Sequence, residues 1–90
     1  MLDEEIYKQA IAVYGATEQE NIAIEECAEL IQAIIHKHRG RRHNIAEEIA
    51  DVEIMIEQLK IINDCPAMVD VIKRSKIKRL QRRLRGEIND

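Results

Sequence analysis

Apolar residues recur every three or four positions along most of the chain, which is the period of an amphipathic α-helix. The pattern is broken at Gly15, around Gly40 and at Asp64-Cys65-Pro66. Glycine commonly ends a helix in a left-handed conformation, and proline is tolerated in a first helical turn. We therefore predict four helices, at residues 2–14, 17–38, 44–63 and 65–86. The chain has one Pro, three Gly and neither Trp nor Phe, and Ile, Leu, Ala, Glu, Lys and Arg dominate. Because this composition is helical, we expect no strands and an all-α fold class, a single four-helix bundle-type domain over residues 1–90.

Helix starts are marked by residues that can cap a backbone amide. Thr17 stands three residues before Glu20, and Asn44 stands three residues before Glu47. This spacing is typical of a capping box. Asp64 precedes the fourth helix and is expected to cap it.

The second and third helices are apolar on more than one side, so each must be covered on more than one side. In residues 17–38 the two opposite apolar faces contain Ile22, Leu30 and Ala33 on one side and Ile24, Ala28, Ile31 and Ile35 on the other. Ninety residues are close to the lower limit for a single core that holds a fold unaided. We predict that the protein is an oligomer, either a homodimer or a homotetramer.

Two segments, 25–30 and 47–52, share the pattern Glu-Glu-x-Ala-acid-aliphatic. Within them Glu26 and Glu29 are three residues apart, as are Glu48 and Asp51, and residues at this spacing share a helix face. If the two helices form an antiparallel hairpin that turns near Gly40, Glu29 faces Glu48 and Glu26 faces Asp51. The four carboxylates would then meet.

These acids lie on the apolar stripes of their helices and not on the polar faces. Carboxylates in an apolar seam repel one another and lose hydration, so such a cluster ordinarily persists only with cations or basic groups nearby. The alternative interpretation, two solvated acidic faces, does not explain the inward position. Oxygen-only ligands favour Mg²⁺ or Mn²⁺, and protein-bound Mg²⁺ commonly completes its shell with water and substrate phosphate. A di-iron site is disfavoured because it needs Glu-x-x-His, whereas the third position here is an acid both times.

Charge is unevenly distributed along the chain. Residues 1–65 hold 6 basic and 14 acidic residues, net −8, and residues 66–90 hold 8 basic and 3 acidic residues, net +5. The last predicted helix also has an apolar stripe that we expect to be buried, formed by Val69, Ile72, Leu80 and Leu84. Lys76 falls on this stripe, flanked by Lys73 and Arg79, and an inward lysine requires an anion. The other cations of this helix are not interleaved with aromatic residues, so nucleic-acid binding is not predicted.

The longest apolar run is too short for a membrane span, and the sequence has no signal-peptide pattern. Cys27 and Cys65 are therefore expected to be reduced thiols with structural roles. These features predict a cytoplasmic protein that does not bind membranes.

The spacing of the acids resembles the signature of a known family. Glu26-x-x-Glu29, eighteen intervening residues and Glu48-x-x-Asp51 are similar to the motif of the all-α nucleoside triphosphate pyrophosphohydrolases. The segments EECAELIQAI and NIAEEIADVEIMIEQL are most similar to sequences of the MazG branch of this family. The resemblance covers residues 17–62.

The resemblance implies that the four acids bind Mg²⁺ and that a nucleoside triphosphate is cut between its α- and β-phosphates, giving a monophosphate and pyrophosphate. It also implies a dimer or higher assembly, with phosphates held by basic residues of the last helix. Lys73, Lys76 and Arg79 are the matching candidates. The chain departs from many members in having no Trp or Phe to hold a base, so base preference stays open.

Two alternatives share some of these features. A phosphoribosyl-ATP pyrophosphohydrolase would have the same fold and a similar acid pattern. A non-catalytic helical oligomer or regulatory module could use the basic last helix, but it would leave the inward acids unexplained.

If the protein is an enzyme, Glu25 or Glu47 could accept a proton from the attacking water. Each lies one residue from a predicted ligand and points about a quarter turn away, so solvated charge is the other interpretation of both.

Overall fold

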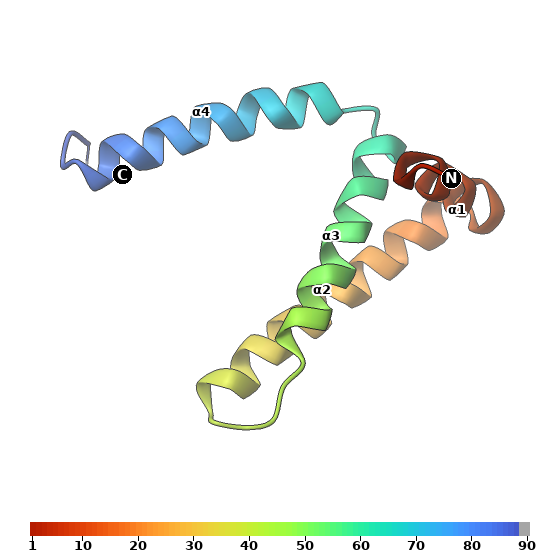
Figure 1. The fold of residues 1–90 in the computed structure, drawn as a ribbon, viewed down its shortest axis with the longest axis horizontal. Coiled ribbons are helices and arrows are strands. Elements are labelled where there is room, and N and C mark those ends of the chain that lie inside the picture. Colours follow the sequence, from red (N-terminus) through yellow and green to blue (C-terminus); the bar gives the residue numbers. More distant parts are fainter. Residues whose placement is uncertain (89–90) are drawn as a thin grey trace.

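A computed structural model describes residues 1–88 and contains four helices. They are α1 (Asp3–Tyr14), α2 (Ala16–His38), α3 (Ile45–Ile62) and α4 (Pro66–Leu84) (Figure 1). The described residues include no strand, so the predicted all-α class is confirmed. Each helix begins and ends within two residues of its predicted limits.

Glycines end α1 and α2, as the sequence indicates. Gly15 has φ 93° and its amide donates to the carbonyl of Ile11 at 2.8 Å. Gly40 has φ 67° and its amide donates to the carbonyl of Lys37 at 3.1 Å. A side chain is strained at these dihedral angles, which explains why glycine occupies both breaks.

The predicted side-chain caps are wrong in detail. Gly15 itself precedes α2, so Thr17 already lies inside the first turn. Asn44 does precede α3, but its side chain makes no capping bond to the backbone. Cys65, not Asp64, precedes α4, because Asp64 has φ 50° and belongs to the turn. Pro66 occupies the first turn of α4 as expected.

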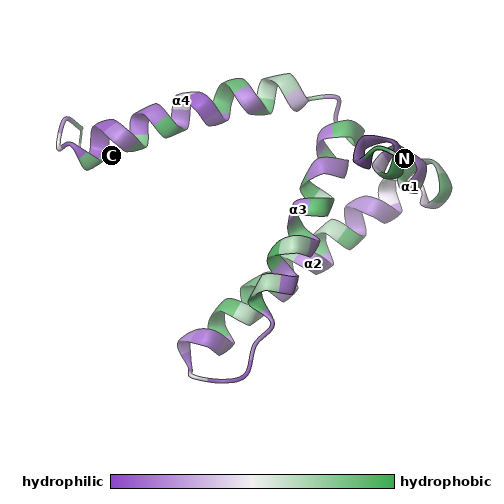
Figure 2. Ribbon diagram, viewed as in Figure 1, coloured by the Kyte–Doolittle hydropathy of each residue, from purple (hydrophilic) through white to green (hydrophobic). Residues whose placement is uncertain are grey.

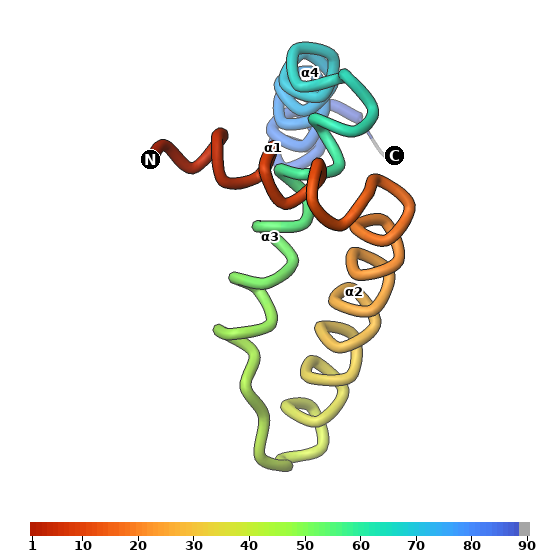
Figure 3. The backbone as a smooth tube through the Cα atoms, turned by 90° about the vertical axis from the view of Figure 1, so that its right-hand side faces the viewer, coloured from red at the N-terminus to blue at the C-terminus, as the bar shows by residue number. Residues whose placement is uncertain are grey.

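Helices α2 and α3 form an antiparallel hairpin, and α1 crosses it at the end opposite the connecting turn (Figures 1 and 3). The buried residues between α2 and α3 include the small side chains Ala23 and Ala33 and the flexible Met55. Two buried glutamines join the helices: the Gln19 Nε2 donates to the Gln58 Oε1 at 2.6 Å. The hairpin is therefore held by a narrow seam that mixes apolar and polar groups.

Helix α4 does not pack along this hairpin. It follows the end of α3 and extends away from it, and no Cα atom of α4 lies within 8 Å of a Cα atom of α1 or α2 (Figures 1 and 3). Hydrophobic and hydrophilic residues alternate along it (Figure 2). None of the described helices is both long and apolar enough to cross a membrane, as expected.

The stripe of α4 that we expected to be buried is exposed within one chain. Ile72 is 46% exposed, Leu80 is 47% exposed and Leu84 is 80% exposed, and only Val69 is half-buried. Lys76, expected to point inward, is exposed as well. Periodicity locates an apolar surface but not what covers it, and within one chain α4 contacts only α3 among the described helices.

Candidate metal-binding site

Acidic side chains from α2 and α3 meet in the middle of the hairpin. Glu26, Glu29 and Glu48 each offer one carboxylate oxygen, and these three oxygens lie within 4.8 Å of one another. The charges of Glu29 and Asp51 raise the pKa values of both Glu26 and Glu48, so Asp51 lies beside this group. The hairpin brings Glu26, Glu29 and Glu48 together, as the predicted antiparallel pairing places them, whereas Asp51 is not among the oxygens within 4.8 Å. Metal binding by these four acids stays a prediction.

Local helix geometry explains this convergence. Glu26 and Glu29 share the α2 face that carries the buried residues Ala23 and Ala33, whose small side chains let the two helices approach closely. The three acids differ in their exposure to solvent. Glu48 is only 7% exposed, Glu26 is half-buried and Glu29 is exposed. The cluster consequently has a dry inner end and an end open to solvent, where an ion could enter.

Two carboxylate oxygens in the cluster lack partners. The Oε2 atoms of Glu26 and Glu48 are both buried, and neither has a hydrogen-bond partner among residues 1–88. The other oxygen of Glu48 is held in place, because Asn44 Nδ2 donates to Glu48 Oε1 at 2.9 Å. Buried polar atoms without partners are costly. Cation binding would satisfy both.

Without a cation, the surroundings of Glu26 and Glu48 make both carboxylates easier to protonate than an exposed glutamate. Burial raises the pKa of Glu26 from 4.5 to about 6, with further contributions from the charges of Glu29, Asp51 and Glu48. Burial also raises the pKa of Glu48; the Asn44 amide opposes this shift, and Glu29 and Asp51 add to it. The charges that raise these pKa values are therefore all those of neighbouring carboxylates.

The other predicted site residues lie outside this cluster. Glu25 and Glu47 are exposed beside it, and Glu47 is joined to it only through a long 3.5 Å hydrogen bond from Asn44. Lys73, Lys76 and Arg79 are exposed on α4, which does not touch α2. Within one chain the structure brings the acids together but does not bring these basic residues to them.

Asn44 is the site residue that the sequence analysis missed. Its spacing to Glu47 predicts a helix cap, whereas its amide group bonds to Glu48, four residues later. An amide and a carboxylate at this spacing can be neighbours on a helix surface, so the spacing permits this contact, but it permits a backbone cap equally well.

Comparisons of the chain with models of protein families, with curated proteins and with solved structures found no match. The comparisons therefore show no family for this chain.

Proposed function

We propose that the protein is a Mg²⁺- or Mn²⁺-dependent nucleoside triphosphate pyrophosphohydrolase. The observation that carries the proposal is the pair of buried, unpartnered oxygens of Glu26 and Glu48 within a cluster of three carboxylates that also includes Glu29. This donor set fits the ion, because hard oxygen ligands suit Mg²⁺ and Mn²⁺. The nucleotide substrate is supported by the resemblance of the two acid motifs to the all-α pyrophosphohydrolases.

In this proposal Glu26, Glu29, Glu48 and Asp51 hold the metal. A bound Mg²⁺ would lower the pKa of a coordinated water and neutralise phosphate charge. Asn44 fixes one oxygen of Glu48 and so limits the directions in which the other can point. Glu29, the exposed member of the cluster, lies where an ion and a phosphate group can approach.

Proton transfer and phosphate binding are assigned to residues around the cluster. Glu47 or Glu25, exposed next to proposed ligands, would accept the proton of the attacking water. Lys73, Lys76 and Arg79 would bind phosphate oxygens as cations. Because α4 does not contact α2, this last role requires α4 of another chain to approach the acids.

The proposal predicts that the purified protein releases pyrophosphate from nucleoside or deoxynucleoside triphosphates only with Mg²⁺ or Mn²⁺. The assay uses a panel of nucleotides that includes phosphoribosyl-ATP, with products separated by ion-exchange chromatography. Turnover of phosphoribosyl-ATP alone would favour that alternative activity. Undiminished turnover in EDTA, or orthophosphate as the sole primary product, would contradict the proposal.

A second prediction concerns Asn44. Asn44→Ala should weaken Mn²⁺ binding by about 10-fold or more, because residues that orient metal ligands typically contribute 10- to 100-fold to affinity. Calorimetric titration measures this directly. Asn63→Ala is the matched control, because Asn63 Nδ2 also makes a 2.9 Å hydrogen bond, to the Leu59 carbonyl, but at the opposite end of α3. Equal affinities for the two variants would mean that Asn44 does not position Glu48.

A further inference from the structure

One chain exposes more surface than a compact protein of its size. Its accessible surface is 7192 Å², whereas a compact monomer of 10.5 kDa has about 5,400 Å². Its radius of gyration is 16.4 Å, compared with about 12 Å for a globular domain of this length. The excess of roughly 1,800 Å² is within the range that each subunit of an obligate dimer buries.

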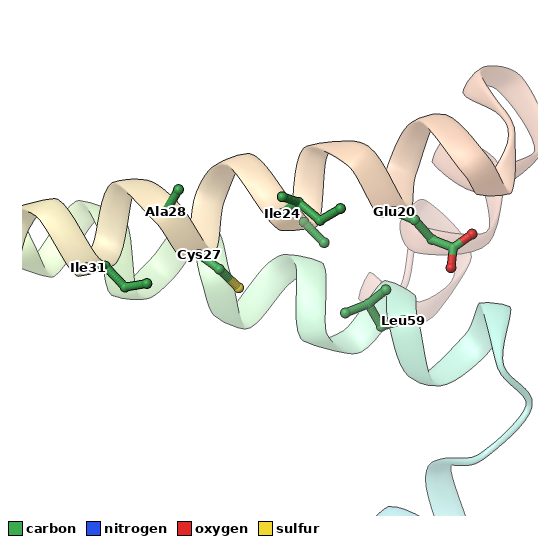
Figure 4. Close-up of a pocket in the computed structure, with 7 residues that line it drawn as sticks. Glu20, Ile24, Cys27, Ala28, Ile31 and Leu59 are labelled. Carbon is green, nitrogen blue, oxygen red and sulfur yellow. The ribbon is translucent and has the colours of Figure 1, made fainter.

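Part of this surface is an apolar groove along α2. We call it the α2 groove. It is lined by Glu20, Ala23, Ile24, Cys27, Ala28, Ile31 and Leu59. Figure 4 shows that Leu59 comes from α3 and that the other labelled side chains come from α2. Ile24 is 68% exposed, so the groove is uncovered within one chain.

A second uncovered surface lies on α4. We call it the α4 stripe. It consists of Val69, Ile72, Lys73, Lys76, Ile77 and Leu80. Apart from its two lysines it is apolar, and the lysine stems can themselves cover apolar surface while their charged ends reach water.

The two surfaces match in length and in charge. The α2 groove runs from Glu20 to Ile31 and the α4 stripe from Val69 to Leu80, so each extends about 18 Å along its helix axis at 1.5 Å per residue. Among the lining residues, the α2 groove has one charged side chain, the acid Glu20, and the α4 stripe has two, the bases Lys73 and Lys76. Opposite charges favour this pairing over pairing of either surface with its own copy.

The α4 stripe cannot fill the α2 groove of its own chain as the helices are arranged. Helix α4 leaves the far end of α3 and makes no contact with α2 among the described residues (Figures 1 and 3). We propose that α4 of a second copy docks in the α2 groove, and that the exchange is reciprocal, giving a homodimer with two identical contacts. This inference does not depend on the proposed enzymatic activity, because the α2 groove lies on the face of α2 opposite to Glu26 and Glu29 and this contact is separate from the phosphate-binding role proposed for α4.

Sedimentation velocity on the full chain tests the proposal with single charge substitutions. Wild type should be a dimer at micromolar concentration. Ile24→Glu in the α2 groove and Leu80→Glu in the α4 stripe should each raise the dimer dissociation constant at least about 10-fold, because a buried unpaired charge is costly. Val71→Glu is the control: Val71 is 68% exposed on α4 but lies outside the α4 stripe. A monomeric wild type, or a dimer that Leu80→Glu and Val71→Glu weaken equally, would overturn the proposal.

Disulfide cross-linking locates the contact even if a charge variant fails to fold. Cys27 lies in the α2 groove, so in a Cys65→Ser background we would introduce Ile72→Cys, Ile77→Cys or Leu80→Cys separately. At least one should give covalent dimers under mild oxidation that disappear with Cys27→Ser, since a disulfide requires Cα atoms about 4.4–6.8 Å apart. Val71→Cys should not. A dimeric protein in which none of the three positions links to Cys27 would show that the subunits pair through other surfaces.

Discussion

Glu48→Gln should reduce kcat/KM for pyrophosphate release by at least about 100-fold, because Glu48 is the most deeply buried member of the carboxylate cluster and even residues that only orient metal ligands contribute 10- to 100-fold. The same substitution should not destabilise the metal-free protein. It removes a charge that burial and neighbouring acids disfavour, and it keeps a side-chain oxygen for the Asn44 amide. The metal-free variant should therefore melt at the same temperature as wild type or higher.

Glu53→Gln is the matched control, because Glu53 is an exposed acid of α3 that is not among the clustered oxygens. It should leave both activity and melting temperature close to wild type, as surface charges contribute little. If Glu48→Gln instead destabilised the metal-free protein while activity was retained, Glu48 would be a structural hydrogen-bonding residue and not a metal ligand.

The stability of the metal-free protein should increase as the pH is lowered from about 7.5 to about 5. Glu26 has a pKa of about 6 in the folded protein against an ordinary value of 4.5, and the pKa of Glu48 is raised as well. A raised pKa means that the folded state binds the proton more tightly than the unfolded state does. The contribution of Glu26 is therefore complete below pH 4.5 and is lost as the pH rises through about 6.

Magnesium should stabilise the protein more at high pH than at low pH, which is the opposite of the pH dependence of the metal-free protein. A ligand that binds only the folded state at 100 times its dissociation constant stabilises by about 2.7 kcal/mol, and a shift of 1 kcal/mol changes the melting temperature of a small domain by roughly 4–8 °C. Protons compete with the ion for carboxylates, so the effect should be large at about pH 7.5 and small at about pH 5. Melting curves in EDTA and in Mg²⁺ at both pH values measure it.

The double variant Glu26→Gln/Glu48→Gln is the control for the pH dependence of stability and for the stabilisation by Mg²⁺. It should lose most of the difference between the two pH values in EDTA, and it should respond weakly to Mg²⁺. If the double variant kept the wild-type pH dependence, the titrating groups would lie elsewhere in the protein.

The hairpin and its acid register could be predicted from the sequence because the signals are local. Gly15 and Gly40 have the positive φ angles that their positions suggest, and the spacing of Glu26, Glu29 and Glu48 fixes which faces they share. A single antiparallel pairing satisfies these spacings, so the sequence alone predicts that the three carboxylates of Glu26, Glu29 and Glu48 meet.

The caps and the last helix could not be predicted in the same way. Asn44 can bond to the backbone or to a side chain one turn later, and only the structure shows that it bonds to Glu48. The stripe that contains Ile72 and Leu80 is apolar, but its exposure depends on what packs against it. The periodicity of apolar residues in α4 does not show whether the surface that covers them belongs to the same chain or to another molecule.

The proposed function depends most directly on whether the acid cluster binds a divalent cation. Titration of Mn²⁺ into metal-free protein, followed by the electron paramagnetic resonance signal of the free ion, measures this without any substrate. The proposal predicts saturable binding by wild type and by Glu53→Gln, and binding weakened by at least about 10-fold in Glu48→Gln. Equal Mn²⁺ binding by wild type and Glu48→Gln, or no saturable binding by wild type, would contradict a metal site at these carboxylates.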